Sequence, residues 1–410
     1  MASSKPIVVH TELEILGDYS LQLNRWMLKA IGAWPKSHST KFEKIVSILL
    51  IITCYFFVLI TVLPCILHLI FEDDDLRTKV IILGPLSHWF LGGVGYTTLL
   101  VHNKEIKWCV DQVKSDWRNA TRPEVQQLML KDAKFGRYVV AFCATLTEFS
   151  TACFTLVRAL TTEVIVVGNE TRIMRMLPCV PYRELVPVHT SPTYELMLIA
   201  QFVSGFVISC AFVGAFSLAT VFTIHAHSQL NVLMMSITEL VDESREKSFE
   251  RDIGAVVRKH LSIFSFISHI EAIMNEICFM ELFKCTFSIC LLGYYILMEW
   301  AQQDFRTMTG YISVFSSMTF NIFMLCFIGE TIKEQCNKVG EAVYMSNWYY
   351  LREKDVLDLM LIISRSCVET NITAGKIVHM SFYTFTGVRF PNFSAQRNRV
   401  NLQTNKKRQA

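Results

Sequence analysis

The chain has 410 residues, of which 52% are hydrophobic and only 18% are charged, and its formal net charge at pH 7 is +3. A soluble protein of this length needs a more polar surface than such a composition supplies. The charge is small, and no basic patch is interleaved with aromatic residues, so we predict no nucleic-acid partner.

Long apolar runs predict helices that cross a lipid bilayer. About 20 helical residues are needed to span a hydrocarbon core of about 30 Å. Five runs reach this length, at 45–71, 80–101, 138–157, 196–224 and 307–329. A sixth, shorter run at 285–298 extends backwards past Lys284. Because the runs do not alternate polar and apolar residues as a β-barrel does, we predict an all-α polytopic membrane protein.

The distribution of Lys and Arg predicts a cytoplasmic N-terminus. The connection 102–137 carries eight of these residues, and the equally long connection 158–193 carries four. Short loops with the excess of positive charge stay on the cytoplasmic side. In this orientation Asn169, in an Asn-Glu-Thr sequon, clearly faces the exterior and is the predicted glycosylation site.

The connections between the runs differ in character. Residues 1–44 carry apolar residues at helical spacing, which lie at the membrane interface or pack under the bundle. The exterior connection 158–193 contains four prolines, so we expect a loop, either a lid over a cavity or a solvated segment. Apolar-faced helices continue past the membrane at 225–237 and 250–284, where they need a neighbouring subunit or other partner to pack against.

No motif predicts an enzyme, a cofactor or a metal site. The chain has no glycine-rich phosphate loop, no His-Glu-x-x-His, no paired Cys-x-x-Cys and no glycine-flanked nucleophilic serine. His88 and Glu148 are strongly polar groups inside apolar runs. Each is either a packing residue with a hydrogen bond or a residue that lines a cavity.

A ligand-binding role fits the apolar runs better. Aromatic residues are dense in the exterior halves of several runs, with small polar residues between them. An apolar cavity with a few polar groups suits a small hydrophobic ligand. The predicted ligand-binding residues are His88, Phe90, Glu148, Phe149, Phe154, Phe202, Phe206, Tyr295, Phe315 and Thr319.

Several short motifs resemble the insect odorant receptor family. The specific block comprises GETIKEQ at 329–335, VGEAVY at 339–344, NWYYL at 347–351, TAGK at 373–376 and MSFYTF at 380–385. Weaker similarity extends back to about residue 45. The amino-acid sequence of residues 373–385 is most similar to that of receptors of bees, wasps and ants.

The resemblance implies a seven-helix subunit that assembles with a co-receptor into a hetero-tetrameric, odorant-gated cation channel. Such a channel would lie in the plasma membrane of olfactory neuron dendrites. The chain lacks the long insertion typical of the co-receptor between the fourth and fifth spans, which implies a ligand-tuning subunit. The implied subunit anchor includes Trp348, Tyr349 and Tyr350, and the implied pore-lining residues are Ser381, Thr384, Phe385 and Val388.

The predicted organisation is a cytoplasmic segment 1–44, six spans with loops over 45–329, an anchor region 330–376, a partial seventh helix 377–388 and a basic tail 389–410. The seventh apolar run stops at Arg389, after little more than half of the hydrocarbon thickness. We therefore predict a truncated pore helix, produced by a read-through or frame change.

Two other hypotheses stay open at the level of sequence. A gustatory receptor, from a related channel family, would share the topology, and its C-terminal signature would fall in the region missing after Val388. A G-protein-coupled receptor would need an exterior N-terminus, opposite to the one that the Lys and Arg distribution predicts.

Overall fold

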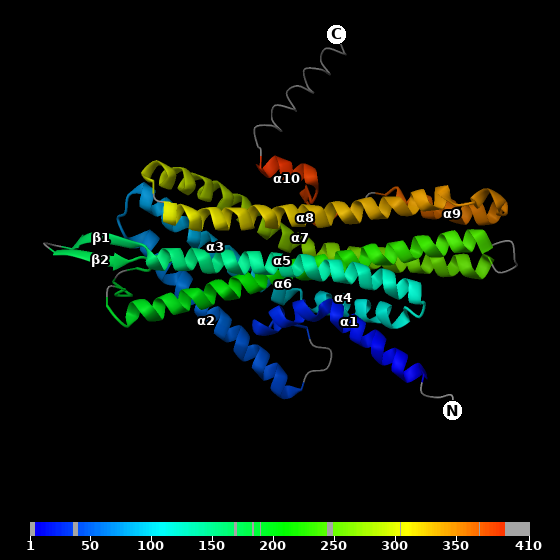
Figure 1. Cartoon of the computed structure of the whole chain (residues 1–410), viewed down its shortest axis with the longest axis horizontal. Helices are drawn as coiled ribbons and strands as arrows, with labels where there is room; N and C mark the ends of the chain where they lie inside the picture. The colour runs from blue at the N-terminus through cyan, green and yellow to red at the C-terminus, as the bar shows by residue number, and fades with distance from the viewer. Residues whose placement is uncertain are drawn as a thin grey trace, which may run out of the picture.

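The computed structural model describes residues 5–35, 40–167, 170–182, 184–188, 190–243, 249–303, 305–368 and 370–389. Long helices make up most of this part of the chain, and several run side by side along the long axis of the molecule (Figure 1). The helices are α1 (Lys5–Ala30), α2 (Lys41–Phe71), α3 (Leu76–Val101), α4 (Asn103–Asn119), α5 (Pro123–Leu160), α6 (Thr193–Glu243), α7 (Phe249–Gln302), α8 (Phe305–Met345), the short 3-10 helix η1 (Trp348–Tyr350), α9 (Glu353–Ser366) and α10 (Phe382–Arg389).

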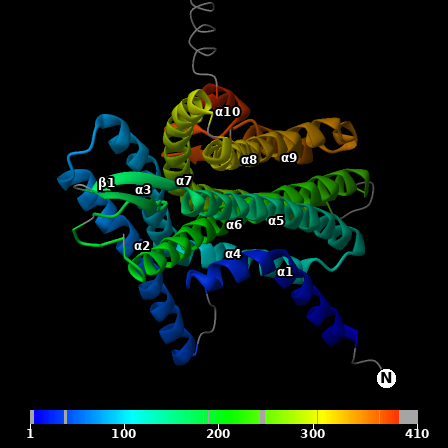
Figure 2. The same cartoon turned by 60° about the vertical axis from the view of Figure 1, so that its left-hand side comes forward.

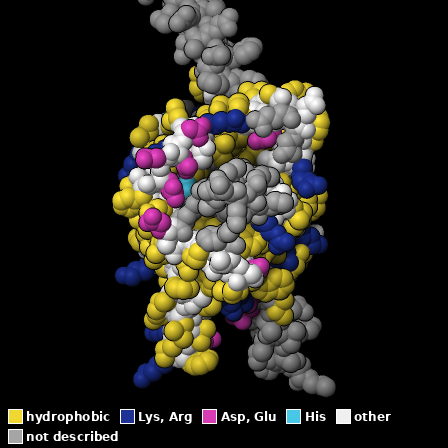
Figure 3. Space-filling view, turned by 90° about the vertical axis from the view of Figure 1, so that its left-hand side faces the viewer, with side chains coloured by type: hydrophobic (Ala, Val, Ile, Leu, Met, Phe, Trp, Pro, Cys, Tyr) yellow, Lys and Arg dark blue, Asp and Glu magenta, His cyan; other side chains and the backbone are white. Residues whose placement is uncertain are grey.

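Five of the described helices are long and apolar enough to cross a membrane, namely α2, α5, α6, α7 and α8. The predicted span 80–101 lies in α3, which packs against α2, α6 and α7. Seen from one end of the bundle, hydrophobic side chains cover much of the flanks (Figure 3). The short sixth run is the outer part of the 54-residue helix α7, so Lys284 lies in a helix interior.

Helix α6 is the central element of the bundle. It contacts α1, α2, α3, α5, α7 and α8. In its most apolar window 67% of the residues are buried, against 22% for α2. A helix that is apolar on every side is stable when other helices surround it, and the 29-residue uncharged run in α6 meets that condition.

The connection 158–193 is more ordered than the predicted loop. Strands β1 (Thr162–Val167) and β2 (Glu170–Arg175) form an antiparallel hairpin at one end of the bundle (Figure 1). The segment after it is tied to the helices, since Gln201 of α6 exchanges two hydrogen bonds with the Cys179 backbone, at 3.0 and 2.7 Å. The predicted glycosylation site Asn169 lies outside the described residues.

The predicted seventh helix begins later than the apolar run does. Residues Thr373–Ala374 (β3) and Val378–His379 (β4) form a small hairpin, and α10 starts at Phe382 instead of near Ile377. Side chains of α7 explain the difference, because Glu271 accepts a hydrogen bond from the Thr373 backbone N–H (2.8 Å) and Asn275 accepts one from that of Lys376 (2.7 Å). These bonds hold the hairpin against α7.

Helix α10 lies against α8, on the side turned away from α5 and α6 (Figures 1 and 2). Phe382 and Phe385 contact Phe323 of α8, with ring centroids 6.0 and 5.4 Å apart. At Gly329 the two segments touch through their backbones. A Cβ added there would lie 2.2 Å from the Met380 carbonyl oxygen.

A polar network joins α4, α6 and α7 in the half of the bundle predicted to be cytoplasmic. The Asp116 carboxylate of α4 meets His225 of α6 at 3.0 Å and Lys259 of α7 at 3.2 Å. Burial alone would raise the pKa of Asp116, but the hydrogen bonds and charges of His225 and Lys259 outweigh it, so this pKa is lowered.

Replacing Gly329 with alanine should destabilise the contact between α8 and the segment before α10. The new methyl group would overlap backbone atoms that cannot rotate away, and overpacking of this kind costs about 1–3 kcal/mol. We expect a lower midpoint of thermal unfolding for the purified protein. Gly293→Ala is the matched control, because nothing lies within 4 Å of its added Cβ. Equal midpoints for the two variants would contradict the close approach.

Asp116→Asn should destabilise the protein at neutral pH by about 1–3 kcal/mol, since His225 and Lys259 lose the carboxylate that they both contact. The stability that the Asp116 carboxylate contributes comes from its lowered pKa in the folded protein. This contribution is therefore fully present above the unfolded pKa of about 3.9, and it disappears as the pH falls through the pKa of Asp116 in the folded protein. Thermal unfolding of both proteins across acidic pH checks this. The exposed Asp358→Asn should show no such difference at neutral pH.

Candidate functional site

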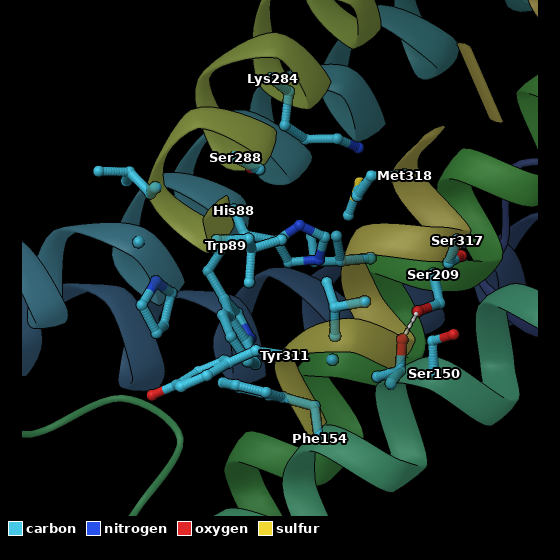
Figure 4. A pocket seen from close by; sticks show the side chains of 18 of the residues that line it. His88, Trp89, Ser150, Phe154, Ser209, Lys284, Ser288, Tyr311, Ser317 and Met318 are labelled. Atoms are coloured by element: carbon cyan, nitrogen blue, oxygen red, sulfur yellow. Dashed lines mark hydrogen bonds between the residues drawn. The ribbon is translucent and has the colours of Figure 1, made fainter. Parts of the chain in front are cut away.

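A cavity of about 90 Å³ lies between α3, α5, α6, α7 and α8 (Figure 4). Its wall is mostly apolar and aromatic, with a small number of polar groups. The lining residues are Ile81, Gly84, Pro85, His88, Trp89, Thr147, Ser150, Thr151, Phe154, Arg158, Gly205, Ile208, Ser209, Phe212, Lys284, Ser288, Leu291, Leu292, Tyr295, Tyr311, Val314, Ser317, Met318 and Asn321. Five helices thus contribute to one chamber.

Aromatic rings form one side of this cavity. Tyr311 of α8 contacts Tyr295 of α7 and Phe154 of α5, with ring centroids 5.4 and 6.3 Å apart. The Tyr295 hydroxyl donates a hydrogen bond to the backbone oxygen of Val80 (2.6 Å), which fixes the ring against α3. Trp89, Phe154 and Tyr311 gather at the same side in Figure 4.

Hydroxyl groups join the helices around the cavity. Thr151 of α5 and Ser209 of α6 share a hydrogen bond of 2.9 Å, drawn as a dashed line in Figure 4. The Trp89 indole N–H donates to Ser204 of α6 (2.8 Å), and Ser204 also bonds Thr61 of α2 (2.9 Å). In an apolar interior such groups are costly without partners, so these bonds stabilise the relative positions of four helices.

The opposite wall of the cavity holds a buried ion pair. Lys284 and Glu281, one helical turn apart on α7, approach to 2.6 Å, and their side chains are only 3% and 8% exposed. The Lys284 ammonium also lies 4.7 Å from the centre of the Phe212 ring. Figure 4 shows this side chain reaching from α7 across the cavity toward Met318.

Four buried polar atoms of residues on the cavity wall have no hydrogen-bond partner within the described part of the chain. They are the hydroxyl oxygens of Ser288 and Thr147, the amide oxygen of Asn321 and the Nε of Arg158. Buried polar groups in proteins are nearly always paired. The unpaired atoms therefore point to a molecule that occupies the cavity. In the same described ranges, no group of three or more His, Cys, Asp and Glu side chains could hold a metal ion.

The structure brings three of the ten predicted ligand-binding residues to the cavity wall, His88, Phe154 and Tyr295. The other seven lie elsewhere. Phe90, Phe149, Phe202 and Phe206 are exposed on the outside of the bundle, and Phe315 packs against the cluster that contains Tyr311. The Thr319 hydroxyl donates to the Phe315 backbone oxygen (2.9 Å), and Glu148 accepts a hydrogen bond from the Cys210 thiol (3.8 Å). Sequence reasoning missed Lys284 as a site residue, although a charge within an apolar run marked it.

The predicted pore and anchor residues are separate from this cavity. Ser381 precedes α10, and Thr384, Phe385 and Val388 belong to that helix. The Thr384 hydroxyl donates to the backbone oxygen of His379 at 2.6 Å. The anchor residues Trp348, Tyr349 and Tyr350 form η1, where Trp348 packs on the core and both tyrosines are exposed.

A second cavity lies closer to the half of the bundle predicted to be cytoplasmic. It has a volume of about 190 Å³ between α5, α6 and α8, near Phe135 and His227. Only three helices border it, and Phe135 at its edge is exposed on the outside of the bundle. The chamber among five helices is the better candidate for a site that encloses a small molecule.

Comparison with known proteins identifies the family. Residues 83–389 match the family model described as "7tm Odorant receptor". The chain belongs to this odorant receptor family. The membership confirms a multi-pass membrane protein and a non-enzymatic chain. It also favours an odorant receptor over a gustatory receptor or a G-protein-coupled receptor.

Individual odorant receptors are distant from this chain in sequence. Odorant receptor 10 of Aedes albopictus is 21% identical over 220 residues, which cover 52% of this chain and 58% of the relative. Odorant receptor 82a of Drosophila melanogaster is 24% identical over 198 residues, which cover 48% and 51%. The chain thus spans about half the length of these curated relatives.

Solved structures show the same fold. The insect olfactory receptor OR5 from Machilis hrabei superimposes with a TM-score of 0.72 at 16% identity, covering 92% of this chain and 98% of that one. The same receptor in complex with eugenol gives 0.69 at 15% identity, covering 91% and 96%. The all-helical odorant receptor bundle is therefore confirmed for this chain.

Phe154→Ala should weaken the response to an activating volatile by roughly 10-fold or more, because it removes a ring from the cavity wall. Phe149→Ala is the matched control on the same helix, since that ring is 67% exposed on the outside of the bundle. The measurement is a concentration–response curve with surface expression checked for both variants. A larger loss for Phe149→Ala would contradict the assignment of the cavity as the site.

Proposed function

We propose that this odorant receptor is a ligand-tuning subunit that binds a small, hydrophobic volatile molecule in the cavity and gates a cation channel. In this proposal it assembles with a co-receptor as a hetero-tetramer in the plasma membrane of olfactory neuron dendrites. The resemblance of 373–385 to receptors of bees, wasps and ants supports an origin in that insect group.

The cavity among five helices is the observation that carries the proposal. Its aromatic and aliphatic wall matches an apolar ligand, and its few polar groups can orient one. A ligand that touches five helices interacts with their relative positions. It can therefore favour one arrangement of the bundle over another, which a gated channel requires.

The proposed anchor lies in residues 330–376. Tyr349, Tyr350, Leu357, Met360 and Leu361 are exposed on η1 and α9, beyond the part of α8 that borders the cavity. Exposed apolar and aromatic side chains gathered in this way are typical of surfaces that pack against another protein. They support a contact between subunits in the half of the bundle predicted to be cytoplasmic.

The proposed pore helix begins with α10. Ser381, just before this helix, and Thr384 within it supply hydroxyl groups, and the Phe385 ring packs on α8. The family match ends at residue 389, at the end of α10. This supports our hypothesis that the sequence departs from the family pattern after Val388.

Expression of the full chain with an odorant receptor co-receptor tests the proposal. We expect inward cation currents in response to at least one member of a panel of small volatile compounds. We expect no odorant-evoked current when either subunit is left out. An N-terminal epitope that antibodies reach on unpermeabilised cells would contradict the orientation. Correctly localised complexes that bind volatiles without ever conducting would contradict the channel.

Replacing residues 390–410 with the corresponding C-terminal segment of OR5 from Machilis hrabei should increase the odorant-evoked current. In the native sequence Arg389 would lie near the middle of the membrane, at a cost of about 2.5–3.5 kcal/mol. Currents are compared at equal surface expression, with Arg389 retained in one exchange and replaced by leucine in a second. A native chain that conducts as well as both exchanged chains would overturn the truncated-helix hypothesis.

A further inference from the structure

The wall of the cavity formed by α7 combines a buried cation with an unpaired hydroxyl. Lys284 uses one N–H on the Glu281 carboxylate (2.8 Å). An ammonium group has three N–H donors, so Lys284 can donate further. Ser288 lies one helical turn along, lines the same cavity, and its hydroxyl has no partner among the residues the structure describes.

These two donors face a chamber whose wall is mostly apolar and aromatic, although Arg158 of α5 and several hydroxyl groups also line it. The Lys284 side chain extends over the cavity, with Ser288 and His88 close by, while Phe154 and Tyr311 lie at the other side (Figure 4). The site therefore has a donor end and a hydrocarbon end. A ligand that fits both is amphipathic, with an acceptor atom at one end of an apolar body.

We propose that the cavity takes a neutral volatile with a carbonyl oxygen, an aldehyde or ketone, and that Lys284 and Ser288 donate hydrogen bonds to this oxygen. The proposal rests on the proposed odorant receptor function and names the chemical class of its ligand. The hydrocarbon part of the ligand lies against the rings of Phe154 and Tyr311.

Charge distinguishes the carbonyl from ionised ligands. Glu281 already neutralises Lys284 in a setting where both side chains are buried. A carboxylate ligand placed at this wall, rather than beside Arg158 of α5, would add a negative charge next to an ion pair that is already neutral. An alkylammonium would place a second cation beside Lys284. Both are costly in a buried apolar site. The neutral carbonyl adds no charge and accepts both hydrogen bonds.

Hydrogen bonding distinguishes the carbonyl from the remaining neutral classes. An alkane leaves the Ser288 hydroxyl buried and unpaired, which costs affinity. An alcohol is the nearest competitor, because the Asn321 amide oxygen is an unpaired acceptor on the same cavity. An alcohol must, however, donate its own hydroxyl proton to an acceptor while its oxygen accepts hydrogen bonds from Lys284 and Ser288. The charged Lys284 donor also favours the carbonyl oxygen, which is the stronger acceptor.

The test is a binding series on the purified full chain in lipid nanodiscs. Heptane, 1-heptanol, heptanal, 2-heptanone, heptanoic acid and heptylamine share their chain length and differ in the polar end. We expect heptanal and 2-heptanone to bind at least about 10-fold more tightly than heptane, with the acid and the amine weakest. Equal binding of heptane and the two carbonyl compounds, or tightest binding of the alcohol, acid or amine, overturns the proposal.

Variants locate the effect. The double substitution Glu281→Leu with Lys284→Met removes both charges together, so that no single buried charge is left unpaired. It should bring the affinity for 2-heptanone down about 10-fold or more, close to that of heptane, with heptane binding unchanged. Ser288→Ala should cost a smaller part of the same preference, and Lys284→Arg should retain most of it.

Controls separate ligand recognition from folding and from gating. Each variant is melted without ligand, and exposed Phe149→Ala should keep the full carbonyl preference. A ketone preference that survives the double substitution overturns the role of Lys284, while odorant-evoked currents would still support the proposed function. Ketone binding that depends on Lys284 but evokes no current would support the role of Lys284 and contradict the proposed channel function. If no volatile binds the wild-type chain, both the proposed function and this inference fail.

Discussion

The need to pair every buried polar group within an apolar bundle governs this structure. Backbone groups meet it by forming helices, since lipid offers them no partner. Side chains meet it across helices, as when Ser204 of α6 receives the Trp89 indole N–H and bonds Thr61 of α2. Each such bond contributes only about 1 kcal/mol, but leaving one unmade costs more. The bonds therefore fix which helices are neighbours and at what height they meet.

Much of the fold could be predicted because apolar length is a direct consequence of bilayer thickness. The runs at 45–71, 138–157 and 196–224 lie within α2, α5 and α6 as expected. The late start of α10 could not be predicted. Its cause is two side chains, Glu271 and Asn275, that lie about a hundred residues earlier in the chain and bond the 373–376 backbone. Composition near residue 377 contains no trace of them.

The site was harder to predict than the fold. In a soluble protein a dense row of aromatic residues marks a buried face, but a membrane helix can point such residues outward into lipid at no cost. Phe149 and Phe154 illustrate this, since both lie on α5 and only Phe154 faces the cavity. Polarity was the better signal. Lys284 is expensive inside an apolar run unless it has a partner or a purpose, and it marks the cavity wall.

Helix α8 is the physical connection between the cavity and the proposed pore segment. Its Tyr311 and Met318 line the cavity, Phe323 packs against α10, and Gly329 allows the Met380 backbone to touch the helix directly. A rigid helix that shifts at one end moves its other contacts with it, and tightly packed interfaces resist partial adjustment. We therefore expect a ligand that displaces Tyr311 or Met318 to shift α10 through one continuous element. The absence of a side chain at Gly329 is what allows the Met380 backbone to lie so close to that element.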